Sequence, residues 1–138
     1  MTMNNPYFTS LNNSIRNVVE SHGDILLTRD PAQNQERQNQ EILDMIDEGM
    51  TVLFANAADS TEIASALEEC KKRGVAVFVV DTEVDDDSNV ISTIQSDNYE
   101  AGRLVAFDLK KRYPDGARII TLYHDSIAST KERLEGFL

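Results

Sequence analysis

The sequence predicts an α/β protein, a three-layer α/β/α sandwich around a mostly parallel sheet. Short apolar runs, typical of buried strands, alternate with longer segments whose apolar residues recur every three or four positions. The links between them are short, and this alternation is the pattern of a parallel sheet covered on both faces. A length of 138 residues suits one domain, and 41% apolar residues are enough for a core.

The first half of the chain is expected to form helix, strand, helix and strand. Pro6 suits the first turn of a helix and Gly23 its end. Pro31 disfavours a helical residue before it, so a loop there separates a short buried strand from the second helix. The predicted ranges are 6–22, 24–28, 33–48 and 51–55, in that order.

The second half continues the alternation. Gly74 ends a helix, Asp97 suits the N-cap of a later one, and the turn at 114–116 separates that helix from another strand. The predicted helices are 61–73, 98–113 and 129–137, and the predicted strands are 75–80, 90–94 and 117–122. Four apolar residues are expected on the inner face of helix 98–113: Leu104, Val105, Phe107 and Leu109.

Both ends of the chain look cut relative to a closed unit. A helix comes first with no complete strand ahead of it, and the chain stops at Leu138, where the last predicted helix is getting under way. A sheet that lacks a strand exposes unpaired backbone groups. We therefore hold dimerisation or strand exchange of the truncated lobe as a hypothesis.

Charge and cysteine content exclude several classes of function. A net charge of -11 argues against nucleic acid, which needs a basic face. Cys70 is alone, so neither a disulfide nor a paired-cysteine metal site is expected, and helical spacing favours a packed role for it. The acidic run 85–87 lacks the alternating oxygens and glycine of a calcium loop. We expect no metal and no cofactor.

Polar residues follow the predicted strands where each one ends. Asn56 comes after one strand, Asp81 after the next, and the Ser-Asp-Asn stretch at 96–98 after a third. Parallel strands place their carboxyl ends along one edge, where open α/β sheets bind ligands. Amides and carboxylates there, with the aromatic pair at 7–8, suit a neutral, hydroxyl-rich ligand better than catalysis.

Six short segments, at ordinary spacing, carry a family resemblance over nearly the whole chain. They are Asn5-Pro6-Tyr7-Phe8, the Gln-rich stretch 34–40, Asn56-Ala57-Ala58-Asp59-Ser60, the run 74–81, Ser96-Asp97-Asn98-Tyr99-Glu100-Ala101-Gly102, and 131–137. Together they resemble the N-terminal lobe of the periplasmic sugar-binding proteins of the ribose-binding type, with periplasmic-binding-protein-like fold I. The resemblance implies a partial lobe over residues 1–138, with the first strand and the whole C-terminal lobe missing.

The resemblance implies a non-enzymatic, sugar-binding component of an ABC-type membrane transport system. Such a protein has two lobes, closes on a monosaccharide by hinge motion, and delivers the sugar to a membrane permease. It works in the periplasm, or outside the cell on a membrane anchor. The signal segment that this location requires is not in the sequence.

The resemblance assigns three candidate ligand residues to the start of the chain. Tyr7 and Phe8 resemble the aromatic pair that stacks on one sugar face, and Asn5 sits in the loop that approaches the ligand. Phe8 has a structural alternative, because its spacing to Leu11 and Ile15 also fits a helix core. Tyr7 points the other way, which favours a ligand role.

Four polar residues complete the candidate site. By the resemblance, Asp81 is similar to the carboxylate that accepts bonds from two sugar hydroxyls, and Arg133 to a guanidinium that donates from the last helix. Asn56 and Asn98 are candidates for the rim of the site. Asp81 has an alternative role as a turn cap, and Arg133 as the partner of a neighbouring glutamate. The stretch 96–98 is first of all a helix cap.

Two other functions remain open. The effector-binding domain of a lactose-repressor-type regulator shares this fold, but that class carries a helix-turn-helix ahead of the lobe, and none is present here. An α/β enzyme would need a phosphate-binding glycine loop or an activated nucleophile. The glycines are isolated, and there is no GxGxxG. We therefore expect a binding protein and no enzyme.

Overall fold

The computed structural model describes residues 2–123 and 128–138, and it divides the chain into two compact units. Unit 1 is Met1–Ile94 and unit 2 is Gln95–Leu138. That residues 1–138 form one partial lobe stays a prediction.

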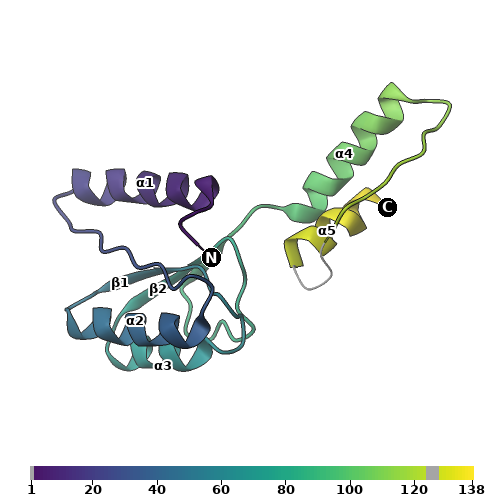
Figure 1. Ribbon diagram of the computed structural model, residues 1–138. Helices are drawn as coiled ribbons and strands as arrows, with labels where there is room; N and C mark the ends of the chain where they lie inside the picture. Colours follow the sequence, from purple (N-terminus) through teal and green to yellow (C-terminus); the bar gives the residue numbers. More distant parts are fainter. Residues whose placement is uncertain (1, 124–127) are drawn as a thin grey trace. The chain divides into compact units, whose positions relative to one another are not determined.

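Unit 1 holds a small parallel sheet with helices on both sides (Figure 1). Strands pair in the order β1-β2-β3, and Leu53 of β1 lies opposite Val77 of β2. Helices α2 and α3 lie together along one face, and α1 lies on the other side (Figure 1). The elements are α1 (Pro6–Ser21), α2 (Gln35–Asp47), β1 (Val52–Ala55), α3 (Ala64–Lys72), β2 (Ala76–Val80) and β3 (Ser92–Ile94). The predicted α/β class with a parallel sheet is confirmed.

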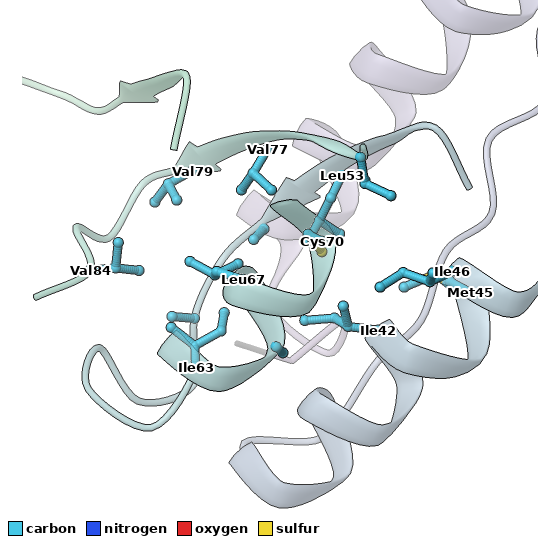
Figure 2. Close-up of a cluster of buried hydrophobic side chains, with 14 residues drawn as sticks. Ile42, Met45, Ile46, Leu53, Ile63, Leu67, Cys70, Val77, Val79 and Val84 are labelled. Carbon is cyan, nitrogen blue, oxygen red and sulfur yellow. The ribbon is translucent and has the colours of Figure 1, made fainter. Parts of the chain in front are cut away.

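The core lies between the sheet and the pair α2 and α3 (Figure 2). Strand residues alternate, so that Leu53 and Val77 are buried on this side while Val52 and Phe54 face the other. Fully burying an aliphatic side chain contributes about 1.5–3 kcal/mol each. The buried cluster is Ile42, Met45, Ile46, Leu53, Ala55, Ala57, Ile63, Ala66, Leu67, Cys70, Val75, Val77, Val79 and Val84. It gives unit 1 its stability.

Cys70 is fully buried in this cluster, as its position in the helix pattern predicted. Desolvation by burial raises the pKa of its thiol from 9.0 to about 11. A thiol of this kind stays protonated at neutral pH and packs as a small apolar side chain.

Two predicted strands are wrong. Residues 24–28 and 117–122 form no strand, although both carry apolar, β-branched sequence. A strand needs a neighbour for its backbone N–H and C=O groups, and no backbone hydrogen bond joins the described residues 24–28 to the sheet of unit 1. The sequence pattern indicates the propensity of a segment to form a strand, but not which strand it would pair with.

Unit 2 consists of α4 (Asn98–Arg112) and α5 (Ala128–Phe137), which pack closely on one another. Each helix has one glycine at the contact, and each glycine faces the backbone of the other helix. A Cβ atom on Gly102 of α4 would lie 2.0 Å from the Arg133 carbonyl oxygen, and one on Gly136 of α5 would lie 2.0 Å from that of Tyr99. Either side chain would collide with backbone, so both positions require glycine.

The predicted inner face of α4 is only partly formed. Leu104, Val105 and Phe107 are exposed, which corrects the sequence expectation, and Leu109 is half-buried. The contact surface of α4 lies instead at its first turns, where Asn98 and Gly102 are buried. No described helix in either unit is long and apolar enough to cross a membrane.

Candidate functional site

The start of α1 presents the aromatic pair that the sequence singled out. Asn5 is the N-cap of α1, and its Oδ1 atom accepts a hydrogen bond from the Tyr7 amide at 3.0 Å. The rings of Tyr7 and Phe8 meet edge to face, with centroids 5.1 Å apart. Tyr7 is exposed and Phe8 half-buried. The cap fixes where the helix starts, and so where these two rings are held.

Phe8 points into a cleft of about 780 Å³ within unit 1, which it lines together with Leu11 and Ile15. The helical spacing predicted this shared face. Asn56 and Val80, at the carboxyl ends of β1 and β2, line the same cleft. Phe8 and Asn56 are therefore the two predicted site residues that share one cavity in unit 1.

Asn56 is the centre of a polar network at the ends of the strands. It is only 5% exposed, and its Nδ2 atom donates to the Val80 carbonyl at 2.7 Å. The same nitrogen lies 3.4 Å from Asp81 Oδ2 and 3.5 Å from Thr82 Oγ1. Its backbone carbonyl accepts from Gln38 Nε2 at 2.9 Å. The amide thus joins the end of β1 to the end of β2.

Asp81 follows β2 with an unusual backbone, since its φ of 74° lies in the left-handed region. Aspartate tolerates this region better than most residues, but strain of this kind concentrates at functional positions. The Asp81 amide donates to the Ile94 carbonyl of β3 at 2.9 Å. Its Oδ1 atom has no hydrogen-bond partner in residues 2–123 and 128–138, so one carboxylate oxygen remains to accept bonds from a ligand.

Two glutamines hold the loop after β1, a role that was not predicted from the sequence. Gln38 Oε1 accepts from the Ala58 amide at 2.9 Å, and Gln35 Oε1 accepts from the Asp59 amide at 2.7 Å. Both side chains are buried near the start of α2. The Gln-rich stretch supported the family resemblance, and the spacing of three that puts both glutamines on one face of the helix could have indicated a shared structural task.

Unit 2 carries the other two candidates. Arg133 Nε donates to Asn98 Oδ1 at 2.9 Å, and Asn98 is buried while Arg133 is exposed. Asp97 Oδ1 accepts from the Glu100 amide at 2.8 Å, so its predicted role as the N-cap of α4 is confirmed. Arg133 has no ion pair with a glutamate in the described residues. The buried amide orients the guanidinium and leaves its terminal nitrogens able to donate.

The described residues offer hydrogen-bonding groups and aromatic surface rather than reactive groups. Among residues 2–123 and 128–138, no group of three or more His, Cys, Asp or Glu side chains is placed to hold a metal ion. In unit 1 an amide and a carboxylate lie together at the strand ends, and such groups form hydrogen bonds with neutral polar ligands.

Comparisons with known proteins agree with the fold. The chain is 30% identical over 137 residues to the ribose import binding protein RbsB of Bacillus subtilis, covering 99% of this chain and 45% of the relative. It matches a Mycobacterium smegmatis ABC transporter solute binding protein with bound glycerol (TM-score 0.87, 28% identity, 99% of this chain, 47% of that one). It also matches a Caulobacter myo-inositol binding protein bound to myo-inositol (TM-score 0.83, 25% identity, 98% and 46%).

The chain spans about half the length of these relatives. The profile of the periplasmic binding protein domain matches residues 1–138, the full sequence. With the parallel sheet and the polar strand ends described above, this match leaves no ambiguity about ancestry. The chain belongs to the periplasmic binding protein domain family.

Proposed function

We propose that this chain is part of the sugar-binding component of an ABC-type import system, and that it contributes to a site for one monosaccharide. The observation that carries the proposal is the pairing of Asp81 with buried Asn56 at the ends of β1 and β2. A carboxylate held from behind by an amide accepts sugar hydroxyl hydrogens in a fixed direction. Charge-assisted hydrogen bonds of this kind are among the stronger polar contacts.

The comparisons support import over the repressor alternative. The Bacillus relative is named an import binding protein, and the Mycobacterium structure an ABC transporter solute binding protein. By this proposal the whole protein works in the periplasm or outside the cell and passes its ligand to a membrane permease. Import binding proteins and repressor effector domains share a fold, so these relatives, and not the shape of the sheet, support import.

The proposal gives each candidate residue a task. Tyr7 covers an apolar face of the sugar ring, and Asn5 fixes the helix that carries it. Phe8 lines the cleft in unit 1, which favours a packing role for that ring. Asn98 and Arg133 of unit 2 belong to the same proposal as hydrogen-bond donors and acceptors for sugar hydroxyls. The proposed ligand is a monosaccharide, and the ligand screen identifies its stereochemistry.

The test uses the full-length, two-lobed protein and a panel of pentoses, hexoses and polyols. A ligand that binds only the folded state raises the melting temperature by mass action, and this identifies the sugar for titration calorimetry. Asp81→Ala should then weaken affinity by about 1.5–3 kcal/mol, the range for a hydrogen bond to a charged group. Asp87→Ala, which removes an exposed acid from a nearby loop, serves as the matched control and should bind like the parent.

One outcome would overturn the proposed function, and another would overturn only the role of Asp81. If no sugar or polyol shifts the melting temperature while a phosphorylated metabolite does, the import function is wrong. If a sugar binds and Asp81→Ala matches Asp87→Ala, the function stands but Asp81 is not a ligand residue.

A further inference from the structure

Asp81 is the middle residue of a tight turn that follows β2. The Thr82 amide donates to the Val80 carbonyl at 3.0 Å, and Asp81 between them has a φ of 74°. A positive φ of this size belongs to the rarer, strained form of the γ-turn. Strained backbone persists only where the surrounding structure holds it in place. The neighbours of this turn therefore decide whether the Asp81 carboxylate is held in one position.

The buried side chain of Asn56 contacts every residue of this turn. Its Nδ2 atom donates to the Val80 carbonyl at 2.7 Å, and it lies 3.4 Å from Asp81 Oδ2 and 3.5 Å from Thr82 Oγ1. Asn56 is only 5% exposed, so these protein groups, and not water, satisfy its amide. The orientation of the turn therefore depends on the position of Asn56.

Gln38 of α2 fixes the backbone of Asn56. Its Nε2 atom donates to the Asn56 carbonyl at 2.9 Å, and its Oε1 atom accepts from the Ala58 amide at 2.9 Å. These atoms belong to the two peptide groups that flank Ala57, so one side chain holds both. Gln38 is itself buried, with 7% of its surface exposed. A chain of hydrogen bonds therefore runs from α2 through Asn56 to the turn at Asp81.

Gln35, one helical turn earlier, holds the same loop without this connection. It is also 7% exposed, and its Oε1 atom accepts from the Asp59 amide at 2.7 Å. Its Nε2 atom donates to Asn39 Oδ1 at 2.8 Å, within the same helix. In the part of the chain that the structure describes, neither of these bonds reaches Asn56 or the turn. The two glutamines are therefore matched in burial and differ in what they hold.

We propose that Gln38 is a positioning residue for the sugar site: it acts through Asn56 to hold the turn at Asp81, and so fixes the carboxylate before a ligand arrives. This inference rests on the proposed function, in which Asp81 accepts hydrogen bonds from the sugar. A ligand that meets a group already in place does not have to order that group on binding, and it binds more tightly for that reason.

The first test needs no ligand and uses the full-length, two-lobed protein. The NMR coupling between the amide proton and the Hα proton of Asp81 reports φ, and exchange of the Thr82 amide proton reports the bond that closes the turn. Both should show one fixed turn in the parent. Gln38→Met, which keeps a side chain of similar length and removes both hydrogen bonds, should give an averaged coupling and faster exchange. Gln35→Met is the matched control and should leave both signals unchanged.

The second test measures affinity for the sugar that the melting-temperature screen identifies. Titration calorimetry is run well below the melting temperature of each variant, so that a loss of stability alone does not change the dissociation constant. Gln38→Met should bind about 2- to 10-fold more weakly, the equivalent of one hydrogen bond, and Gln35→Met should bind like the parent. Adding Gln38→Met to Asp81→Ala should cause no further loss, because the carboxylate through which Gln38 acts is already gone.

Three results would overturn the proposal. They are an averaged Asp81 coupling in the sugar-free parent, equal behaviour of the two glutamine variants, and additive losses in the double variant. The first of these needs no variant, so it decides the matter even if Gln38→Met does not fold. If no sugar binds, the proposed function fails instead, and the sugar-free signals alone decide whether Gln38 holds the turn.

Discussion

Asn56 shows how one side chain can organise a site. Its amide nitrogen donates to the Val80 carbonyl and approaches the Asp81 carboxylate, while its backbone carbonyl is held by Gln38. Because the amide is buried, water cannot reach it, and these protein groups satisfy its hydrogen-bonding atoms instead. The position of Asp81 therefore depends on a residue 25 positions earlier in the chain.

Replacing Asn56 by alanine should destabilise unit 1. The change removes one of the two donors to the Val80 carbonyl, which keeps the Thr82 amide at 3.0 Å, and the loss of one intramolecular hydrogen bond costs about 0.5–1.5 kcal/mol. Urea denaturation followed by circular dichroism measures the loss. Gln40→Ala is the control, because the exposed Gln40 side chain donates to Asp44 within α2 and is no part of this network. Equal midpoints for the two variants would show that the network does not hold the strands.

The titration of Cys70 should appear in the pH dependence of stability. Its folded pKa of about 11 lies above the value of 9.0 for a free thiol, so the folded state binds the proton more tightly. This contribution to the free energy of unfolding is complete below pH 9.0 and is lost as the pH rises towards 11. Melting temperatures across this interval should fall faster for the parent than for Cys70→Ala. Parallel curves would contradict the assigned pKa.

Sequence alone predicted which residues lie at the strand ends, but not how they are connected. The polar residues at positions 56 and 81 were predicted because each follows an apolar run. The buried bonds between them, and the positive φ of Asp81, depend on the register of β1 against β2. The register of two strands is fixed by packing between segments that lie far apart in the chain, so the local sequence pattern does not predict it.

At the scale of elements, α4 and α5 pack closely because each has a glycine at the contact, where any side chain would collide with the other helix. Gly102 and Gly136 each face a backbone carbonyl of the other helix, so the two backbones are in direct contact. The motif glycines of the family resemblance thus have a packing explanation. The predicted apolar face of α4 was partly wrong because this close approach occurs at its first turns, away from Phe107.

Gly102→Ala should separate the two helices of unit 2. The new methyl group would lie 2.0 Å from the Arg133 carbonyl oxygen, and backbone cannot rotate away as a side chain can. Overpacking of this kind costs about 1–3 kcal/mol. Hydrogen exchange at α5 amides should accelerate in this variant and remain unchanged in Lys110→Ala, an exposed change on the same helix. Unchanged exchange in both would exclude the glycine contact as a source of stability.

Helices were predicted better than strands, for a physical reason. A helix satisfies its backbone groups within one segment, so the ends of α1 and α2 fall within two residues of the predicted ranges. A strand satisfies them on a neighbour. Residues 24–28 have strand-like sequence and form no strand, because no described segment of unit 1 pairs with them.

At the scale of the whole molecule, stability is unevenly distributed. Every residue of the buried cluster lies between Ile42 and Val84, inside unit 1. In unit 2, the described part of the helices buries only Asn98 and Gly102. Regions with few buried apolar contacts open at lower free energy than the core. The sequence pattern, which distributes apolar residues along the full length, did not indicate this imbalance.

Hydrogen exchange should reveal two levels of protection. Amides of β1, β2, α2 and α3 are expected to exchange slowly, through opening of the core. Amides of α4 and α5 should exchange faster, through separate opening of unit 2. Exchange followed by mass spectrometry on peptides from each unit measures both. A single rate common to all helices would mean that the two units unfold as one.

Chemical labelling of Cys70 would report the opening of the core of unit 1. It is the only cysteine in the sequence and it is fully buried, so a thiol reagent can reach it only when α3 leaves the sheet. The rate of labelling therefore counts opening events of unit 1, without tags or added probes. A sugar that binds at the strand ends would stabilise the closed state, and the labelling rate would fall by the same factor as the population of the open state. A partner that separates α3 from the sheet would speed it.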